Sequence, residues 1–204
     1  MPIKRKPKPS LLANLPKKSR YVSRGGDKLR GALETFGISV KGKTCLDVGS
    51  STGGFTDCLL QAGAKSVYAV DVGWGLLDYT LRKDPRVHVL ERTNFRFFNA
   101  ASLSPKPDFA GVDVSFISLD KILPKLAEVL SGAEALVLVK PQFEGTPKEA
   151  PGGIVRDEGI RQKILHQVKT MATNTGFTVA GLMDSPVKGR KGNQESFLYL
   201  VRPS

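Results

Sequence analysis

Short runs of apolar, often β-branched residues alternate along this chain with segments whose apolar residues recur at helical spacing. The runs predict strands at 44–48, 66–70, 87–90, 109–114, 135–139, 177–183 and 196–201. The periodic segments predict helices at 27–36, 54–62, 76–83, 119–130 and 157–173. This alternation predicts an α/β fold whose mostly parallel central sheet is covered by helices on both faces.

Local signals refine some of these elements. Gly37 is placed to end the first helix as a carboxyl-terminal cap, and Asp157 is placed to begin the last one. The run at 135–139 is wholly apolar, which predicts an interior strand. The glycines and prolines of 142–155 predict a long mobile loop.

The segment 46–55 (LDVGSSTGGF) is the centre of the expected site. A strand, a loop of small residues and a helix follow one another here, as in the first unit of a nucleotide-binding sheet. From Gly49 the next glycine is Gly53, so this is not the dinucleotide pattern G-x-G-x-x-G, and no P-loop lysine follows. An acidic residue just before the glycines, Asp47, suits a cationic nucleoside better than a phosphate. We therefore predict a site for S-adenosylmethionine.

Other polar residues should face the same crevice, because ligands of open parallel sheets lie across the carboxyl ends of the strands. Asp71, Asp113 and Lys140 follow three of the predicted strands. Asp71 comes 24 residues after Asp47, where a carboxylate can accept both ribose hydroxyls of an adenosine. The alternative role for Asp71 is to cap the next helix.

The net charge of +12 is concentrated near the amino terminus. Residues 1–30 contain ten Lys or Arg and one acid, whereas the rest contains 21 basic and 18 acidic residues. Residues 1–20 hold too little apolar surface to order themselves, so we expect a flexible basic tail before one domain at 21–204. Such a tail favours a polyanionic partner, most simply nucleic acid, although basic tails also serve solubility.

The remaining composition speaks against other classes of protein. Cys45 and Cys58 are expected to be reduced, buried packing residues. With two histidines and no further cysteines, no metal site is expected. The longest apolar run, 135–139, is far too short to span a membrane, and we expect a cytoplasmic protein with no membrane partner.

Five motifs occur in order, at 23–29 (SRGGDKL), 47–57 (DVGSSTGGFTD), 113–119 (DVSFISL), 139–144 (VKPQFE) and 192–195 (GNQE). Together they resemble the hemolysin-A-like (TlyA) ribosomal RNA methyltransferases, within the FtsJ-type 2′-O-ribose methyltransferases. The resemblance covers about 21–202 and implies a Rossmann-like S-adenosylmethionine-dependent methyltransferase fold. The family usually carries an amino-terminal S4-type RNA-binding domain, whereas here about 20 residues, many of them basic, precede the matching part.

The resemblance implies a catalytic Lys-Asp-Lys-Glu tetrad, which matches Lys28, Asp113, Lys140 and Glu195. A ribose 2′-hydroxyl must lose its proton as it attacks the methyl group, and a lysine beside another cation can accept it. Lys140 is the expected proton acceptor, and Lys28 is expected in the first turn of its helix. Taken singly, each residue could instead be an ordinary surface charge.

The predicted contacts to cofactor and RNA lie partly in these motifs and partly at strand ends and at basic residues that flank the crevice. The cofactor contacts are Asp47, Gly49, Ser50, Ser51, Gly53, Gly54, Phe55, Asp71, Asp113, and Thr93 and Asn94 beside the adenine base. The RNA contacts are Arg24, Lys188, Arg190 and Lys191, the last three of which could equally be a solvated basic hairpin. Phe143 and Phe116 could stack on a splayed base, although core packing is the favoured role for Phe116.

The preferred hypothesis is an enzyme that methylates a ribose 2′-hydroxyl in RNA, most simply ribosomal RNA. A methyltransferase of small molecules or proteins would need neither the basic tail nor the tetrad. A non-catalytic RNA-binding or assembly factor is the main alternative. The family name also suggests membrane lysis, which the absence of a spanning segment or amphipathic lipid helix in the sequence speaks against.

Overall fold

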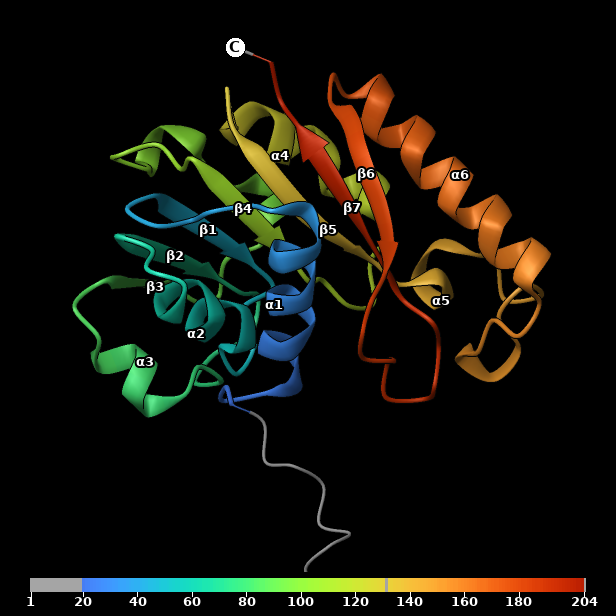
Figure 1. Cartoon of the computed structure of the whole chain (residues 1–204), viewed down its shortest axis with the longest axis horizontal. Helices are drawn as coiled ribbons and strands as arrows, with labels where there is room; N and C mark the ends of the chain where they lie inside the picture. Colours follow the sequence, from blue (N-terminus) through green and yellow to red (C-terminus); the bar gives the residue numbers. More distant parts are fainter. Residues whose placement is uncertain (1–19, 131, 204) are drawn as a thin grey trace, which may run out of the picture.

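A seven-stranded sheet in the order β3-β2-β1-β4-β5-β7-β6 forms the centre of the molecule (Figure 1). The computed structural model describes residues 20–130 and 132–203, so the tail expected at 1–20 lies, apart from Arg20, outside the described residues. The strands are β1 Thr44–Val48, β2 Ser66–Val70, β3 Val87–Leu90, β4 Phe109–Val112, β5 Glu134–Val139, β6 Thr178–Asp184 and β7 Ser196–Val201.

The direction of the strands locates the expected crevice. β1 pairs in parallel with β2 and β4, and parallel pairs also join β2 to β3 and β4 to β5. β7 runs antiparallel between β5 and β6. The sheet is therefore mostly parallel, as predicted, and its winding reverses between β1 and β4. In doubly wound sheets such a switch point opens the ligand crevice at the carboxyl ends of the strands.

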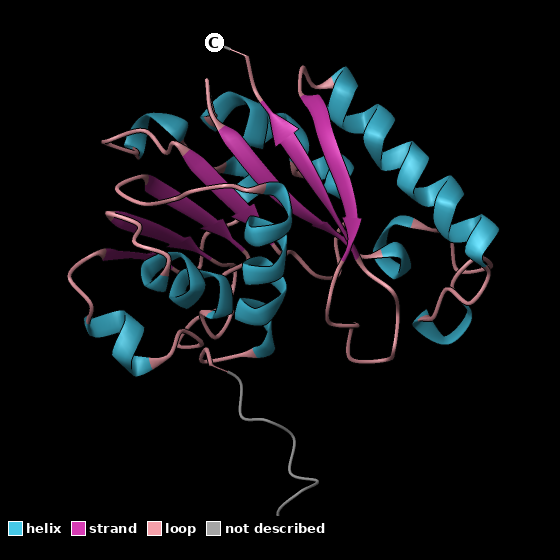
Figure 2. Cartoon of the chain, in the orientation of Figure 1, coloured by secondary structure: helices cyan, strands magenta, loops and turns pink. Residues whose placement is uncertain are grey.

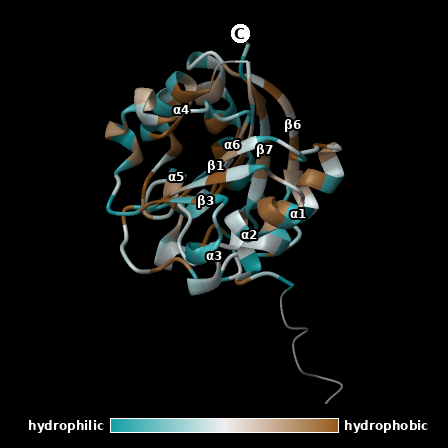
Figure 3. Ribbon diagram, turned by 90° about the vertical axis from the view of Figure 1, so that its left-hand side faces the viewer, coloured by the Kyte–Doolittle hydropathy of each residue, from teal (hydrophilic) through white to brown (hydrophobic). Residues whose placement is uncertain are grey.

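Helices cover both faces of the sheet (Figure 2). They are α1 Arg24–Phe36, α2 Gly54–Gln61 and α3 Tyr79–Lys83 on one face, and α4 Leu123–Val129 and α6 Glu158–Asn174 on the other. In a view turned by 90°, α1 and α4 lie on opposite sides of β1 and β7 (Figure 3).

The residues of β1 alternate between the two cores, because successive side chains of a strand point to opposite faces. Cys45 belongs to the core beneath α1 and α2, and Leu46 and Val48 belong to the core beneath α4 and α6. Cys45 and Cys58 are both buried and free, which confirms their predicted packing role.

Three predicted helices are wrong in extent by more than one residue, and one of them, α1, begins at Arg24 rather than at 27. α3 begins at Tyr79 rather than at 76, because Asp78 is its N-cap and the carboxylate accepts the Thr80 N–H. The helix predicted at 119–130 is a 3₁₀ turn at Leu119–Lys121 followed by α4. Pro124 lies in the first turn of α4, the only part of a helix that tolerates its missing N–H.

The segment 142–155 is not a structureless loop, so the prediction is wrong there. It contains the end of α5 Pro141–Glu144 and a 3₁₀ turn at Pro151–Gly153. Buried Asn193 holds its far end: the Val155 N–H donates to Asn193 Oδ1 at 2.9 Å, and Asn193 Nδ2 donates to the Gly153 carbonyl at 2.9 Å.

Candidate functional site

The glycine-rich loop between β1 and α2 lies at the switch point and packs against the end of β4. Gly49 has a φ of +88°, and a Cβ there would lie 2.6 Å from the Asp113 carbonyl oxygen. Gly53 has a φ of +99°, and a Cβ there would lie 2.3 Å from the Leu81 side chain. Because a side chain fits at neither position, these two glycines let the loop pack tightly against Asp113 and Leu81 at the crevice, where the ligand of such a sheet lies.

The next residues of the motif serve helix packing. A Cβ on Gly54 would lie 2.2 Å from Ser23 Oγ and 2.9 Å from the Gly26 nitrogen, so the starts of α1 and α2 are in close contact. Phe55 is buried, with its ring centroid 6.1 Å from that of Phe197 on β7. This packing draws the first turns of α1 towards the crevice.

Asp47 lies beneath the loop and not at its surface. Its side chain is wholly buried, and the Thr56 hydroxyl donates to Oδ2 at 2.6 Å. The other oxygen, Oδ1, accepts no hydrogen bond from any described residue. Burial raises the pKa of the Asp47 carboxyl to about 7, and the nearby Asp113 and Asp71 add to the rise.

Asp71 links the loops that follow β1, β2 and β3 through hydrogen bonds. Its carboxylate accepts the Ser51 N–H at 2.7 Å and the Gly73 N–H at 2.7 Å, and its carbonyl accepts the Thr93 N–H at 2.9 Å. Each carboxylate oxygen keeps a second lone pair for a further donor. Ser50 is buried and Ser51 is exposed.

Asn94, which follows Thr93, has a local role. Its side-chain oxygen accepts the Arg96 N–H and so caps a 3₁₀ turn at Phe95–Phe97. The structure therefore brings Ser51, Asp71 and Thr93 together and gives Asn94 a capping contact beside them.

The four predicted tetrad residues form two ion pairs. Lys140 Nζ lies 2.5 Å from Asp113 Oδ1 and donates a hydrogen bond to Ser115 Oγ at 2.8 Å. Lys28 Nζ lies 2.5 Å from Glu195 Oε2. The exposed fractions of Lys28, Lys140 and Glu195 are 9%, 8% and 2%, so both lysine amines are largely withdrawn from water.

The two ion pairs are neighbours at one edge of the sheet. β5 and β7 are antiparallel, and Val139 pairs with Ser196. Lys140 follows Val139 and Glu195 precedes Ser196, so these two occupy the next position on adjoining chains. Asp113, which follows β4, pairs with Lys140, and Lys28 of α1 pairs with Glu195. α1 begins at Arg24, so Lys28 lies in its second turn and not, as predicted, in its first.

An exposed aromatic pair stands beside Lys140. The side chain of Phe116 is 91% exposed and its backbone is left-handed, with a φ of +63°, so the prediction of core packing is wrong. Its ring centroid lies 5.0 Å from that of Phe143, and Lys140 Nζ lies 5.9 Å from the Phe143 ring. The loop after β4 turns the ring outward, which hydrophobicity alone does not reveal.

The predicted RNA contacts are exposed. Arg24 is at the start of α1, and Lys188, Arg190 and Lys191 lie on the loop between β6 and β7 that also carries Glu195. Lys191 Nζ donates to the Gly152 carbonyl at 3.0 Å, which spends one of its three donors.

Sequence reasoning missed a second group of exposed aromatic and basic side chains near Asp71. Trp74 and Phe97 are 68% and 75% exposed, with the Arg92 guanidinium 4.9 Å from the Trp74 ring centroid and Arg96 5.0 Å from that of Phe97. The signal available in the sequence was the only tryptophan, three residues after Asp71.

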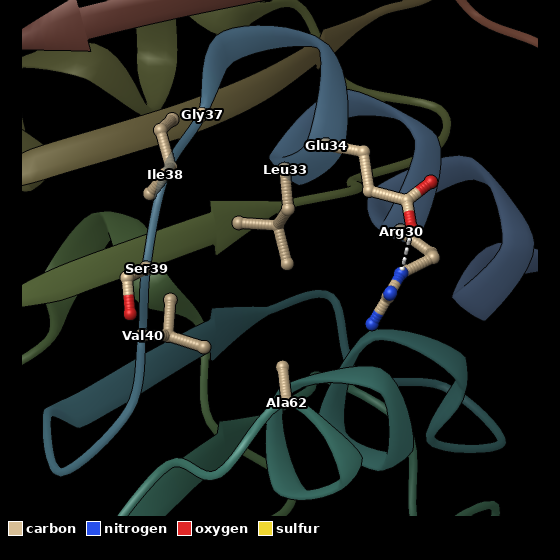
Figure 4. Close-up of a pocket in the computed structure, with 8 residues that line it drawn as sticks. All are labelled: Arg30, Leu33, Glu34, Gly37, Ile38, Ser39, Val40 and Ala62. Carbon is tan, nitrogen blue, oxygen red and sulfur yellow. Dashed lines mark hydrogen bonds and ion pairs between the residues drawn. The ribbon is translucent and has the colours of Figure 1, made fainter.

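A shallow pocket of about 300 Å³ lies apart from these residues (Figure 4). It is lined by the end of α1, the following loop and Ala62. Its two charged side chains, Arg30 and Glu34, pair with each other, so it presents no group for chemistry. Among the described residues, no helix combines the length and the apolar character that crossing a membrane requires.

Comparisons with known proteins agree with this geometry. The model of the FtsJ-like methyltransferase family matches residues 21–202. The chain is 50% identical over 187 residues to YqxC of Bacillus subtilis, covering 90% of this chain and 66% of that protein. It is 48% identical over 182 residues to the 16S/23S rRNA (cytidine-2′-O)-methyltransferase TlyA of Mycobacterium tuberculosis, covering 88% of this chain and 68% of that protein.

Solved structures show the same fold. One from Streptococcus thermophilus, described as a hemolysin, superposes with a TM-score of 0.89 at 47% identity, over 92% of this chain and 69% of that one. An S-adenosylmethionine-dependent methyltransferase from Aquifex aeolicus, at 19% identity and a TM-score of 0.60, covers 87% of this chain and 92% of that one and shares the fold alone. The chain spans about two thirds of the length of the curated relatives YqxC and TlyA. From the match over 21–202 and these identities, the chain belongs to the FtsJ-like methyltransferase family.

Proposed function

We propose that this chain transfers a methyl group from S-adenosylmethionine to a ribose 2′-hydroxyl of RNA, most simply ribosomal RNA. One observation carries the proposal: two buried lysine–carboxylate pairs, Lys140–Asp113 and Lys28–Glu195, adjoin each other at the carboxyl ends of the strands. The relative named as an rRNA (cytidine-2′-O)-methyltransferase supports the substrate class. Ribosomal RNA as substrate places the work in the cytoplasm.

The residues around the glycine-rich loop fit this cofactor. Gly49 and Gly53 let the loop pack closely at the crevice, Ser51 is exposed there, and Asp71 has lone pairs to spare for ribose hydroxyls. We expect the loop backbone, Ser51 and Asp71 to hold the nucleoside, with Thr93 beside the base. Asp47 would act from beneath, by fixing the loop through Thr56. When bound, the sulfonium supplies an electrophilic methyl group.

Lys140 would accept the proton of the ribose hydroxyl at Nζ. The new bond joins the ribose oxygen to the methyl carbon as the carbon–sulfur bond breaks, so the proton is the one species the protein must take up. An amine accepts a proton only in its neutral form, so Lys140 would have to be unprotonated when the hydroxyl attacks. Asp113 would then hold the ammonium that results, and Glu195 would hold Lys28 in place.

RNA is supported as the substrate by what surrounds these pairs. Exposed cations stand at Arg24, Lys188 and Arg190, where phosphates would approach the crevice. Phe116, with Phe143 against it, offers an exposed ring beside Lys140, and enzymes that read single-stranded RNA stack splayed bases on such rings. Trp74, with Arg92 against its ring, would offer a further stacking surface for the RNA strand.

The test is transfer of labelled methyl from S-adenosylmethionine to ribosomal RNA, both as free RNA and in assembled subunits. Alkaline hydrolysis of RNA needs a free 2′-hydroxyl, so the expected product is label in an alkali-stable dinucleotide. Label on a base would contradict the ribose chemistry. Cofactor binding without transfer to either form of RNA would favour a non-catalytic RNA-binding or assembly factor.

A further inference from the structure

Glu144, the last residue of α5, reaches across to the loop that follows β4. Its half-buried carboxylate accepts the Ser118 hydroxyl at 2.7 Å and the Leu119 N–H at 3.0 Å. Both donors belong to the start of the 3₁₀ turn Leu119–Lys121. Burial raises the pKa of Glu144, and these two donors oppose that rise.

The other end of the same loop is held by the same stretch of chain. Lys140, which directly precedes α5, pairs with Asp113 and donates to Ser115 Oγ at 2.8 Å. The loop from Asp113 to Leu119 is therefore fixed at both ends by residues only four positions apart in the sequence.

Phe116 stands between these two anchors. It is the most exposed of the large apolar side chains in the described residues, at 91%, and its φ of +63° is uncommon for a residue other than glycine. A bulky residue keeps such a conformation only where its surroundings hold it. Phe143, next to Glu144, meets the Phe116 ring at a centroid distance of 5.0 Å.

We propose that Glu144 is a positioning residue for the target nucleotide: it holds the Asp113–Leu119 loop so that Phe116 and Phe143 present a stacking surface beside Lys140. The proposal rests on the proposed function and adds a residue that contacts neither cofactor nor substrate. A carboxylate suits this role because it only accepts, and it meets two donors here. An amide keeps the size of the side chain but loses the charge, and it can meet both groups only if the Ser118 hydroxyl becomes the acceptor.

The experiment compares Glu144→Gln with Glu149→Gln. Glu149 is the control, because its carboxylate also accepts a hydroxyl and a backbone N–H, both from Thr146, and pairs with Lys163, and none of these partners belongs to the loop after β4. We expect Glu144→Gln to lower kcat/KM for RNA about tenfold, as loss of a charged hydrogen bond does. Cofactor affinity should stay within about twofold of the wild type, and Glu149→Gln should match the wild type in both.

A double-mutant cycle with Phe116→Ala separates positioning from general destabilisation. If Glu144 acts through Phe116, then Phe116→Ala with Glu144→Gln should be no slower than Phe116→Ala alone. Ser118→Ala, which removes one donor, should reproduce part of the Glu144→Gln effect. The proposal would be overturned if the two losses of kcat/KM multiplied in the double variant. It would also be overturned if Glu144→Gln lowered cofactor affinity as much as it lowered kcat/KM for RNA.

Equilibrium RNA binding by the same variants provides a readout that needs no methyl transfer. A wild-type protein that binds RNA without methylating it would end the proposed function, yet the binding cycle would still decide the role of Glu144. Coupled losses of RNA affinity at Glu144 and Phe116 support it, and independent losses overturn it.

Discussion

Lys140 and Glu195 lie side by side where β5 ends and β7 begins, one position beyond the pair Val139–Ser196. Each forms an ion pair with a residue from another part of the fold, Lys140 with Asp113 and Glu195 with Lys28. Residues separated by up to 167 positions in the sequence thus form two ion pairs on adjoining chain segments.

The Lys28–Glu195 pair should be costly to break from one side. Lys28→Met leaves the Glu195 carboxylate, only 2% exposed, without its partner, and we expect the free energy of unfolding to fall by about 3–5 kcal/mol. Adding Glu195→Gln removes the stranded charge and should recover most of that loss. Urea unfolding of the single and double variants measures both. A double variant no more stable than Lys28→Met would contradict the buried pair.

Asp47 should make stability depend on pH. In the folded protein its pKa is about 7, against 3.8 ordinarily, so between these values the unfolded chain releases the proton first. The wild type therefore loses stability through this group as the pH rises from about 4 to 7. Asp47→Asn removes the titration and can still accept from Thr56. We expect its stability relative to the wild type to rise by up to about 4 kcal/mol across that range.

Urea unfolding at several pH values tests this prediction. A stability difference between Asp47→Asn and the wild type that stays constant from pH 4 to pH 8 would show that Asp47 is already charged in the fold. The direction of the change matters most, because a carboxylate stabilised as an anion would give the opposite slope, and only below about pH 4.

We expect a substitution at Gly49 to affect cofactor binding more than the same substitution at Gly42, which has a similar backbone conformation but open space around it. Gly49→Ala brings a Cβ within 2.6 Å of the Asp113 carbonyl, whereas at Gly42, with a φ of +75°, a Cβ meets nothing within 4 Å. Both variants strain a left-handed backbone, so their difference isolates the contact with β4. We expect Gly49→Ala to weaken S-adenosylmethionine binding at least about tenfold by displacing the loop, and Gly42→Ala to leave it unchanged. Calorimetric titration with S-adenosylmethionine measures both affinities. Equal affinities of the two variants would show that the loop is not the binding element.

The basic loop between β6 and β7 should act through RNA phosphates. Replacing Lys188 and Arg190 by alanine is expected to weaken RNA binding and to reduce the slope of log affinity against log salt by about 1 per lost contact. Lys65→Ala is the control, because this exposed lysine lies at the amino end of β2, away from the crevice. Similar losses in the control and the test variant would mean that only net charge matters.

Local sequence patterns predicted the strands of the sheet more accurately than the helices and loops around it. β1, β2, β3 and β7 have the predicted bounds, because each is a short apolar run between polar residues. The start of α3 is set instead by a local cap, Asp78, which hydrophobicity does not show. The loop that carries Phe116 is held by Lys140 and Glu144, and these contacts join distant segments, so spacing does not show them.

The residues of the candidate site also divide into those that the sequence predicts and those that only the fold brings together. Asp113 and Lys140 could be placed at the crevice because they follow parallel strands, whereas the tetrad, with Lys28 and Glu195, was predicted through a family resemblance, since Lys28 and Glu195 meet only by folding. Asp71 and Thr93 could be placed from the topology, because both follow parallel strands whose carboxyl ends share one edge. The burial of Asp47 could not, because the same motif could leave the carboxylate above or below the loop.

The most direct test of the account is the single-turnover rate of methyl transfer into an alkali-stable dinucleotide of ribosomal RNA, for the wild type and for Lys140→Ala. Loss of the proton acceptor should slow transfer by about 10² to 10⁴-fold, with cofactor affinity unchanged. Transfer by Lys140→Ala at close to the wild-type rate would contradict the proposed role of Lys140.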